Sequence, residues 1–288
     1  MPELPEVEVV KRSLKRKIQN LIIKSVKIND GNLRYKVNRD QISKLIGKKI
    51  KKIERKSKFL IFNTDKDLFM LVHLGMTGKF FFVNENKKKF KTSFYYDLNE
   101  NKDHKYDRVV FFFNNNQKLI YNDVRKFGFI KIYNLNEKNN LHLKILGPEP
   151  LEKKCNLIYF KNYIKGRERT IKDILMDQKC VSGLGNIYVN EILFLSGIRP
   201  TRKVKKLKDL EIEEILENAK KILKRSIKLG GSSIKNFSSG NGKRGSFQQL
   251  FNVYGRKGRK CSNVDCKMRI YRIKISNRAT FFCKSCQK

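Results

Sequence analysis

No apolar run in this 288-residue chain approaches the roughly 20 residues that a transmembrane helix requires. The first residues, Met-Pro-Glu-Leu-Pro-Glu, also lack the basic start and the apolar stretch of a signal peptide. These absences argue against a helical membrane protein and predict a soluble protein of the cytoplasm. The length of 288 residues is enough for one large domain or two ordinary ones, and the hydrophobic share of 40% allows the chain to fold.

Acidic residues are scarce. Only 27 Asp and Glu stand against 66 Lys and Arg, which gives a formal net charge of +39. Such an excess indicates a polyanionic partner, usually DNA or RNA. The chain is also rich in Asn, Ile and Phe, so an A+T-rich genome is an alternative source of part of the lysine on solvated faces. Charge therefore supports a nucleic-acid partner without naming a function.

Cysteine is nearly absent outside the C-terminus, where four of the six lie within the last 28 residues. Cys155 and Cys180 stand alone and are expected to be small buried apolar residues. In a chain without export signals, the clustered four predict a zinc ribbon whose thiolates hold one structural zinc ion, with disulfides as the alternative. Their pattern is Cys261-x4-Cys266-x16-Cys283-x2-Cys286.

Short β-type runs fill the chain from about residue 21 to 135, separated by turns rich in Asn, Lys and Gly. Their spacing is typical of an antiparallel sandwich or barrel. The runs are Leu21–Ile28, Lys58–Asn63, Leu68–Leu74, Lys79–Val83, Arg108–Phe113, Lys118–Tyr121 and Phe127–Tyr133.

Helical patterns open the chain and return in its second half. Pro5 suits a first helical turn, and Glu3 and Glu6 suit the positive end of a helix dipole. Thr170 can cap a later helix, and Gly230-Gly231 can end another. The expected later helices cover about residues 170–178, 186–197 and 207–229.

These patterns predict an α+β protein of several domains. Residues 1–135 are expected to form an antiparallel β-sandwich with a leading helix, and residues 136–155 a linker. Residues 156–250 should form a helical domain, in which the Ser-, Gly- and Lys-rich segment 232–249 is a surface loop. Residues 251–288 carry the four cysteines.

Three motifs suit DNA binding but also have ordinary structural explanations. Gly183-Leu-Gly-Asn186 precedes a helix whose free N–H groups can bind phosphate, and it equally suits a plain connection between helices. Arg125-Lys-Phe127 can wedge into a base stack, or Phe127 can belong to the core. Met76, within His73-Leu-Gly-Met76, is by itself more typical of packing. From the residues alone these alternatives stay open.

Pro2 gives the chain a candidate nucleophile. A Pro after the initiator Met generally becomes the mature N-terminus. A free α-amino group has a pKa of about 8, so an appreciable fraction is unprotonated near neutral pH. A secondary amine that attacks a carbonyl-level carbon forms a charged iminium, which favours elimination. Glu3 and Glu6 lie close by in the sequence and can move protons. The alternative is a proline merely tolerated ahead of a helix.

Eight segments, in order over nearly the whole chain, carry a resemblance to a known family. They are Met1–Glu8, Arg55–Leu60, His73–Gly78, Leu146–Leu151, Leu175–Asp177, Gly183–Tyr188, Val253–Arg256 and Asn277–Phe281. Together they resemble the bacterial formamidopyrimidine-DNA glycosylases, which repair 8-oxoguanine. The resemblance implies that a β-sandwich, a helix–two-turns–helix domain and a zinc ribbon bind double-stranded DNA across a cleft.

The same resemblance implies residue roles. Pro2 is the Schiff-base nucleophile, Glu3 a proton donor supported by Glu6, and Lys58 a further proton donor. Arg278, on the ribbon hairpin, grips the phosphates around the flipped nucleotide and assists elimination. Segment 232–249 matches the part that covers the extruded base. The implied DNA contacts are the three void-filling residues Met76, Arg125 and Phe127, together with His73, Tyr106, Arg167, Asn186 and Tyr254.

The chain also departs from the family pattern. The first cysteine pair has x4 spacing where x2 is common. Val124 and Lys126 replace the usual Pro and Arg beside Arg125, and Tyr106 stands where a DNA-contacting His is frequent, with His104 nearby. None of these changes touches Pro2.

The expected function is therefore that of a bifunctional glycosylase and AP lyase for oxidised purines. We expect it to act as a monomer on the DNA of the bacterial nucleoid, with one structural zinc and no redox cofactor or catalytic metal. One alternative is the sister endonuclease VIII-like enzyme for oxidised pyrimidines, which typically lacks Leu4-Pro5 and the Arg125/Phe127 pair. Another is a zinc-ribbon protein that binds DNA without chemistry, which has no use for the set of Pro2-Glu3, Lys58 and Arg278.

Overall fold

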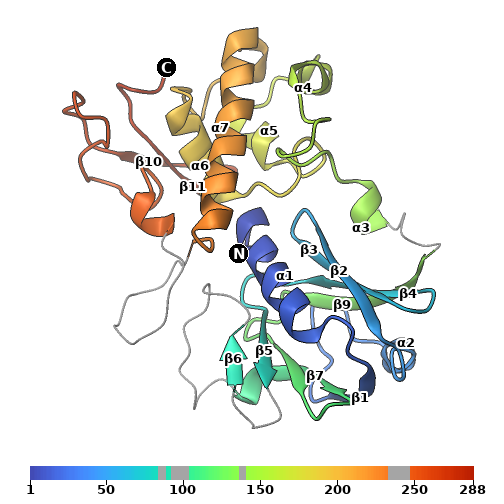
Figure 1. Ribbon diagram of the computed structural model, residues 1–288. Helices are drawn as coiled ribbons and strands as arrows, with labels where there is room; N and C mark the ends of the chain where they lie inside the picture. The colour runs from blue at the N-terminus through green and yellow to red at the C-terminus, as the bar shows by residue number, and fades with distance from the viewer. Residues whose placement is uncertain (84–88, 92–103, 136–140, 233–246) are drawn as a thin grey trace. The chain divides into compact units, whose positions relative to one another are not determined.

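Helix α1 (Leu4–Ile18) opens the chain, as the sequence predicts (Figure 1). Glu3 is its N-cap and forms a capping box with Glu6, and Pro5 lies in the first turn, where no backbone N–H donor is needed. The apolar side chains Val7 and Leu14, spaced at helical period, are completely buried. The start of the helix is thus fixed by its own side chains, and one face is fixed by packing.

The computed structural model describes residues 1–83, 89–91, 104–135, 141–232 and 247–288. The described residues form two units. The first contains Met1–Leu143 and the described residues that follow from Gly230, and the second contains Lys144–Leu229 and residues 247–288.

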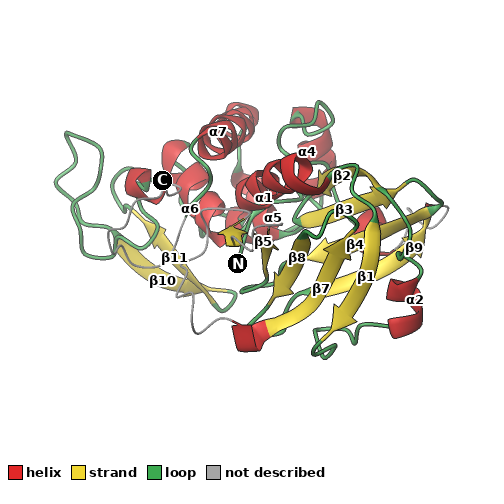
Figure 2. Cartoon of the chain, turned by 60° about the horizontal axis from the view of Figure 1, so that its bottom comes forward, coloured by secondary structure: helices red, strands yellow, loops and turns green. Residues whose placement is uncertain are grey.

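Two antiparallel sheets make up the first unit (Figure 2). The five-stranded sheet has the order β1 (Ile23–Ile28), β7 (Asp107–Phe113), β8 (Lys118–Asn122), β5 (Lys79–Val83) and β6 (Lys89–Lys91). The four-stranded sheet has the order β2 (Ile50–Lys56), β3 (Phe59–Thr64), β4 (Leu68–His73) and β9 (Phe129–Asn134). Short helices α2 (Arg39–Ser43), η1 (His104–Tyr106) and α3 (Leu141–Lys144) lie in the connections.

The main core of this unit contains side chains from both sheets and from α1. On β7, Val109 and Phe111 belong to it, whereas the intervening Val110 faces a separate apolar cluster with Phe81. This alternation is the period-two pattern of a strand that is covered on both faces. The expected antiparallel sandwich with a leading helix is confirmed.

The second unit combines helices and a hairpin. Its elements are α4 (Leu157–Ile164), α5 (Ile171–Met176), α6 (Asn186–Leu195), η3 (Val204–Lys206), α7 (Asp209–Lys228), η4 (Phe247–Leu250) and the paired strands β10 (Tyr271–Ile275) and β11 (Arg278–Phe282). Helix α6 is buried on nearly all sides and packs against α5, α7 and β11. Thr170 caps α5, and Gly230 and Gly231, both with positive φ, follow α7, as predicted.

Some elements differ from the sequence-based expectations. Strand β2 and helix α4 were not predicted, and β9 begins at Phe129 instead of Phe127. Most of the expected loop 232–249 lies outside the described residues, and its end forms η4. In the described part of the chain, no helix is both long and apolar enough to cross a membrane.

Candidate active site

The first residues of the chain form a buried acidic corner of the first unit. Pro2, Glu3 and Glu6 are all buried. The Glu3 backbone N–H donates to Glu6 Oε2 at 2.9 Å, and Glu6 Oε1 accepts both the backbone N–H and the hydroxyl of Ser232, at 2.8 and 2.9 Å. Glu6 therefore fixes the segment that carries Pro2 and Glu3, and ties it to Ser232.

Lys58 lies in the tight turn between β2 and β3 and is only 6% exposed. Ser57 before it has a positive φ of 55°, which a two-residue hairpin turn requires. Arg55 holds this turn to α1, because it donates to Glu8 Oε2 at 3.0 Å and to the Ser57 carbonyl at 2.9 Å. The arrangement fixes Lys58 relative to the start of α1.

Four of the predicted site residues act electrostatically on the N-terminal amine. Burial lowers the pKa of the Met1 amine, and Lys58 and Arg125 lower it further, while Glu3 and Glu6 act in the opposite direction. An amine at this position is thus easier to deprotonate than one in water. Basic and acidic groups that act on the same nitrogen are suited to proton transfer.

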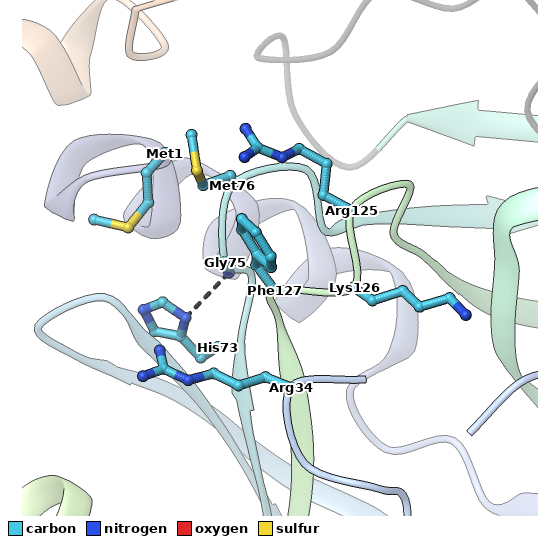
Figure 3. A pocket seen from close by; sticks show the side chains of 8 residues that line it. All are labelled: Met1, Arg34, His73, Gly75, Met76, Arg125, Lys126 and Phe127. Carbon is cyan, nitrogen blue, oxygen red and sulfur yellow. Dashed lines mark hydrogen bonds between the residues drawn. The ribbon is translucent and has the colours of Figure 1, made fainter. Parts of the chain in front are cut away.

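A cavity of about 580 Å³ lies beside this corner (Figure 3). Met1, Met76 and Arg125 lie at one end of it and His73 and Arg34 at the other, whereas Lys126 points away, toward its ion pair with Asp30 at 2.8 Å. The lining residues are Met1, Arg34, His73, Gly75, Met76, Arg125, Lys126 and Phe127.

His73 is held as a neutral ring at the cavity. Its Nδ1 accepts the Gly75 N–H at 3.1 Å, and its ring stacks on Phe129 with centroids 5.7 Å apart. Burial lowers the pKa of His73 to about 4, and the nearby cations Lys58 and Arg34 act in the same direction. With Nδ1 occupied as an acceptor, Nε2 carries the proton and is a donor.

The three residues expected to fill a void are on the surface and not in the core. Met76 is 41% exposed, Phe127 is 46% exposed, and Arg125 is exposed as well. The Arg125 guanidinium lies 4.6 Å from the centroid of the Phe127 ring (Figure 3). The alternative that Phe127 and Met76 are packing residues is therefore wrong. Tyr106, at the end of η1, lies beside Arg108, with 5.5 Å between the guanidinium and the ring centroid.

In the second unit, Arg278 begins β11 directly after a tight hairpin turn. Ser276 and Asn277 both have positive φ, 45° and 61°, as the favoured two-residue turns require. The Ser276 hydroxyl donates to Asp173 Oδ1 at 2.7 Å, which anchors the hairpin tip to α5. Arg278 is exposed and lines a cavity of about 500 Å³ with Arg169 and Lys179.

Two further contacts attach β11 to the helices. Asn186, at the start of α6, donates to the Ala279 carbonyl at 2.9 Å, so one of its two amide hydrogens is used within the protein. Lys172, only 1% exposed, donates to the Thr280 hydroxyl, and burial lowers its pKa to about 8. Lys172 could not be singled out in advance, because in the sequence nothing distinguishes it from the other lysines until its burial is known.

The remaining predicted DNA contacts have defined places in the second unit. Arg167 follows α4, and its guanidinium lies 4.2 Å from the centroid of the Tyr163 ring. Tyr254 stands edge-on to Phe281 at 5.2 Å, and its backbone N–H donates to the buried Glu191 at 2.8 Å. The predicted contact roles of these residues stay predictions.

The four clustered cysteines are placed to bind one metal ion. Their sulfur atoms all lie within 4.8 Å of one another, and no disulfide is formed among the six cysteines of the chain. Cys261 and Cys286 Sγ are 3.8 Å apart and Cys266 and Cys283 Sγ 3.6 Å, far longer than the 2.05 Å or so of a disulfide bond. Four thiolates about 2.3 Å from a central zinc lie about 3.8 Å apart in a tetrahedron, so the residues fit such an ion.

Comparisons with known proteins agree with this fold. Residues 1–130 match the profile described as the formamidopyrimidine-DNA glycosylase N-terminal domain, and residues 146–238 match the H2TH domain of the same enzymes. The chain is 37% identical to the formamidopyrimidine-DNA glycosylase of Rickettsia massiliae, over 100% of this chain and 97% of that protein. It is 38% identical to the Rickettsia bellii enzyme, over 100% of both.

Solved structures of Lactococcus lactis Fpg are similar as well. A mutant in complex with Fapy-dG containing DNA is 34% identical, with a TM-score of 0.86 over 100% of both chains. The complex with DNA containing an abasic site is 34% identical, with a TM-score of 0.85 over 99% of both. Fold and sequence together define a DNA glycosylase of base-excision repair. More narrowly, the chain belongs to the formamidopyrimidine-DNA glycosylase family.

Proposed function

We propose that this protein removes oxidised purines, 8-oxoguanine and formamidopyrimidines, from double-stranded DNA and then cuts the strand as an AP lyase. The Lactococcus relatives were crystallised with Fapy-dG and with abasic DNA, which supports this class of substrate. A DNA-repair activity belongs with the chromosome, so we place the protein on the nucleoid in the bacterial cytoplasm. We expect it to work as a monomer.

One observation carries the proposed chemistry: Pro2 and Glu3 are buried together in a corner where Lys58 and Arg125 act on the terminal amine. Once Met1 is removed, the Pro2 nitrogen is a secondary amine in the same surroundings. It attacks C1′ of the damaged nucleotide, the glycosidic bond breaks, and Glu3 supplies the proton to the departing base. The nitrogen loses its own proton, the C1′–O4′ bond of the sugar ring breaks as O4′ takes up a proton, and the nitrogen is left joined to the opened sugar as an iminium.

The iminium makes the adjacent C2′ hydrogen acidic. Loss of that proton expels the phosphate on the 3′ side, and a second elimination expels the phosphate on the 5′ side. Lys58 is buried beside the amine and is the candidate for the further proton transfers, while Glu6 holds Glu3 in place. The Arg278 side chain is exposed and binds the phosphates of the flipped nucleotide.

The four cysteines are proposed to hold one structural zinc ion. A four-thiolate site leaves no open position for a substrate or water, so its contribution is to folding and not to catalysis. The hairpin that it orders is small, and it carries Arg278. Through the fold of this hairpin, zinc fixes the position of Arg278.

The experiment that tests this function is covalent trapping. Borohydride should reduce the iminium and leave a protein–DNA adduct on a duplex with 8-oxoguanine, and peptide mapping should place it on Pro2. Lysine amines have a pKa of about 10.4 against about 8 for an N-terminus, so Pro2 should win over them at neutral pH. Pro2→Gly supplies a primary amine and should trap with reduced yield.

A matched control blocks the Pro2 nitrogen and leaves the residues from Pro2 onward unchanged. Retaining Met1, or adding an N-terminal tag, locks the Pro2 nitrogen in an amide and should abolish cleavage while damage binding stays largely intact. If the blocked protein cleaves as fast as the processed one, the proposed chemistry is wrong. Thymine-glycol duplexes measured in parallel test the sister enzyme, which prefers oxidised pyrimidines.

A further inference from the structure

The two loops that carry Met76, Arg125 and Phe127 meet at one buried carboxylate. Asp123 is 0% exposed, and its two oxygens are divided between the loops. Oδ1 accepts the hydroxyl of Thr77, the residue after Met76. Oδ2 accepts the backbone N–H of Gly128, the residue after Phe127, at 2.9 Å.

Thr77 completes the link. Its hydroxyl donates to Asp123 and at the same time accepts the backbone N–H of Arg125 at 3.0 Å. The same side chain thus connects the loop of Met76 with the backbone of Arg125. Hydrogen bonds to a buried carboxylate are stronger than neutral ones, so this is a firm connection between exposed loops.

The backbone of the two loops is in direct contact as well. A Cβ atom built on Gly75, which has a φ of +59°, would lie 2.4 Å from the Gly128 nitrogen. A Cβ atom built on Gly128 would lie 1.8 Å from the hydroxyl oxygen of Tyr121. Only glycine fits at either place. Burial, with Asp123 nearby, raises the pKa of Tyr121, so its hydroxyl stays a donor, 3.4 Å from Asp123 Oδ2.

Asp123 also reaches Tyr106, a further predicted DNA contact, through its backbone. Its N–H donates to the Tyr106 carbonyl at 3.1 Å, and its carbonyl accepts the Arg108 Nε–H at 2.9 Å. The segment that follows η1 is therefore tied to the same residue as the two loops.

We propose that Asp123 and Thr77 are positioning residues, which hold Met76, Arg125 and Phe127 as one rigid unit and so set the preference for the base opposite the lesion. The inference rests on the proposed function. Met76, Arg125 and Phe127 are exposed, so packing in a core cannot fix them. Readout by hydrogen bonds needs donors held within about 0.5 Å, and the buried link is the described feature that restrains both loops.

Thr77→Val and Thr77→Ser test the proposal as a pair. Both keep the backbone, but only Ser keeps the hydroxyl. The readout is the ratio of single-turnover cleavage rates for 8-oxoguanine opposite C and opposite A. Thr77→Val removes both hydrogen bonds of the hydroxyl and should lower this ratio at least about fivefold, which corresponds to about 1 kcal/mol, and Thr77→Ser should retain it. Asp123→Asn replaces one carboxylate oxygen by an NH₂ group, which cannot accept a hydrogen bond from the Thr77 hydroxyl or the Gly128 N–H. This variant should therefore lower the ratio as well.

Thr64→Val is the control for general loss of stability. The Thr64 hydroxyl is also buried in the first unit and donates to the carbonyls of Lys66 and Leu68 at 2.9 Å, away from the cavity. Thr64→Val should lower the midpoint of thermal unfolding without changing the ratio of the cleavage rates opposite C and opposite A.

The outcomes distinguish a failure of the proposed function from a failure of this inference alone. A wild-type protein that cleaves neither duplex overturns the proposed function, and this inference with it. A wild-type protein that prefers C, with the same preference in folded Thr77→Val, overturns this inference alone. Equal losses of preference in Thr77→Val and Thr64→Val also overturn it, since the link would then act only through stability. Should Thr77→Val fail to fold, the same criteria apply to Asp123→Asn.

Discussion

At the scale of single residues, Arg125 is the cation that we expect to read the base opposite the lesion. It is exposed, and its guanidinium stacks on an equally exposed Phe127 ring. An Arg side chain can donate two hydrogen bonds in parallel to a base edge, an interaction worth about 1–3 kcal/mol, or roughly ten- to hundredfold in selectivity. Such a donor, held near a cavity, suits the cytosine left without a partner when the lesion is flipped out.

Arg125→Ala should therefore flatten the preference for lesion:C over lesion:A in single-turnover cleavage. Arg125→Lys keeps the charge but not the planar fork, so it should bind DNA nearly as well and still lose most of the preference. A wild-type enzyme without any partner-base preference would show that Arg125 has another role.

His73 gives the protein a pH-dependent contribution to stability. Its pKa is lowered by burial to about 4, against about 6.5 in an unfolded chain, so the folded state keeps the ring neutral. Between these values the unfolded state binds more protons. The contribution is therefore fully present above pH 6.5 and is lost as the pH falls toward 4.

We expect the difference in unfolding free energy between wild type and His73→Gln to shrink by up to about 2 kcal/mol from pH 7.5 to 4.5. Denaturant unfolding at several pH values measures it. A difference that stays constant over this range contradicts the neutral ring.

At the scale of elements, the C-terminal hairpin keeps the proposed metal site and the proposed DNA-binding residue Arg278 apart. Cys283 is completely buried within the sulfur cluster, whereas Arg278 is exposed at the other end of β11. Cys283→Ser should lose both zinc and DNA binding, because the hairpin has too little core to fold alone. Arg278→Ala should keep about one equivalent of zinc by elemental analysis and still bind duplex DNA more weakly. Full binding and activity in metal-free protein would argue against a structural zinc.

The sequence predicted those elements whose pattern is strongly periodic or capped. Helix α7 has a clear apolar stripe, and α5 has Thr170 as its N-cap. Strand β2, with the sequence IKKIERK, was missed because only Ile50 and Ile53 of its residues are buried. Helix α4 was missed because it buries little beyond Phe160. Segments whose stability comes from tertiary contacts leave no local pattern.

The same limit applies to the site. Pro2, Glu3 and the four cysteines could be proposed as site residues from the sequence, because residue type and spacing suggest their chemistry and the family resemblance supports it. The pairing of Thr77 with Asp123 is not, since these residues are 46 positions apart and meet only through the packing of the sheets. Lys172, whose partner Thr280 is 108 positions away, was missed for the same reason.

At the scale of the whole molecule, the cations behind the net charge of +39 serve different purposes. Part of it has structural uses. Lys24 and Lys27 are exposed on β1, an edge strand, where lysine discourages pairing with another chain. Others, such as Lys161 with Asp209 at 2.8 Å, form surface ion pairs. Only the cations that touch phosphates contribute to DNA binding through release of counterions.

Salt dependence distinguishes these classes of cation. Each phosphate contact contributes about −0.9 to the slope of log K against log salt, so six to ten contacts weaken binding by about 10³–10⁵ between 50 and 200 mM salt. Arg278→Ala should make the slope less negative by about 1, because it removes a phosphate contact. Replacement of both Lys24 and Lys27 by Ala removes twice the charge and should leave the slope unchanged. Titrations of a labelled duplex at four or more salt concentrations give the slopes. If the double lysine variant makes the slope less negative by more than Arg278→Ala does, net charge governs binding. The assignment of Arg278 as a phosphate clamp is then wrong.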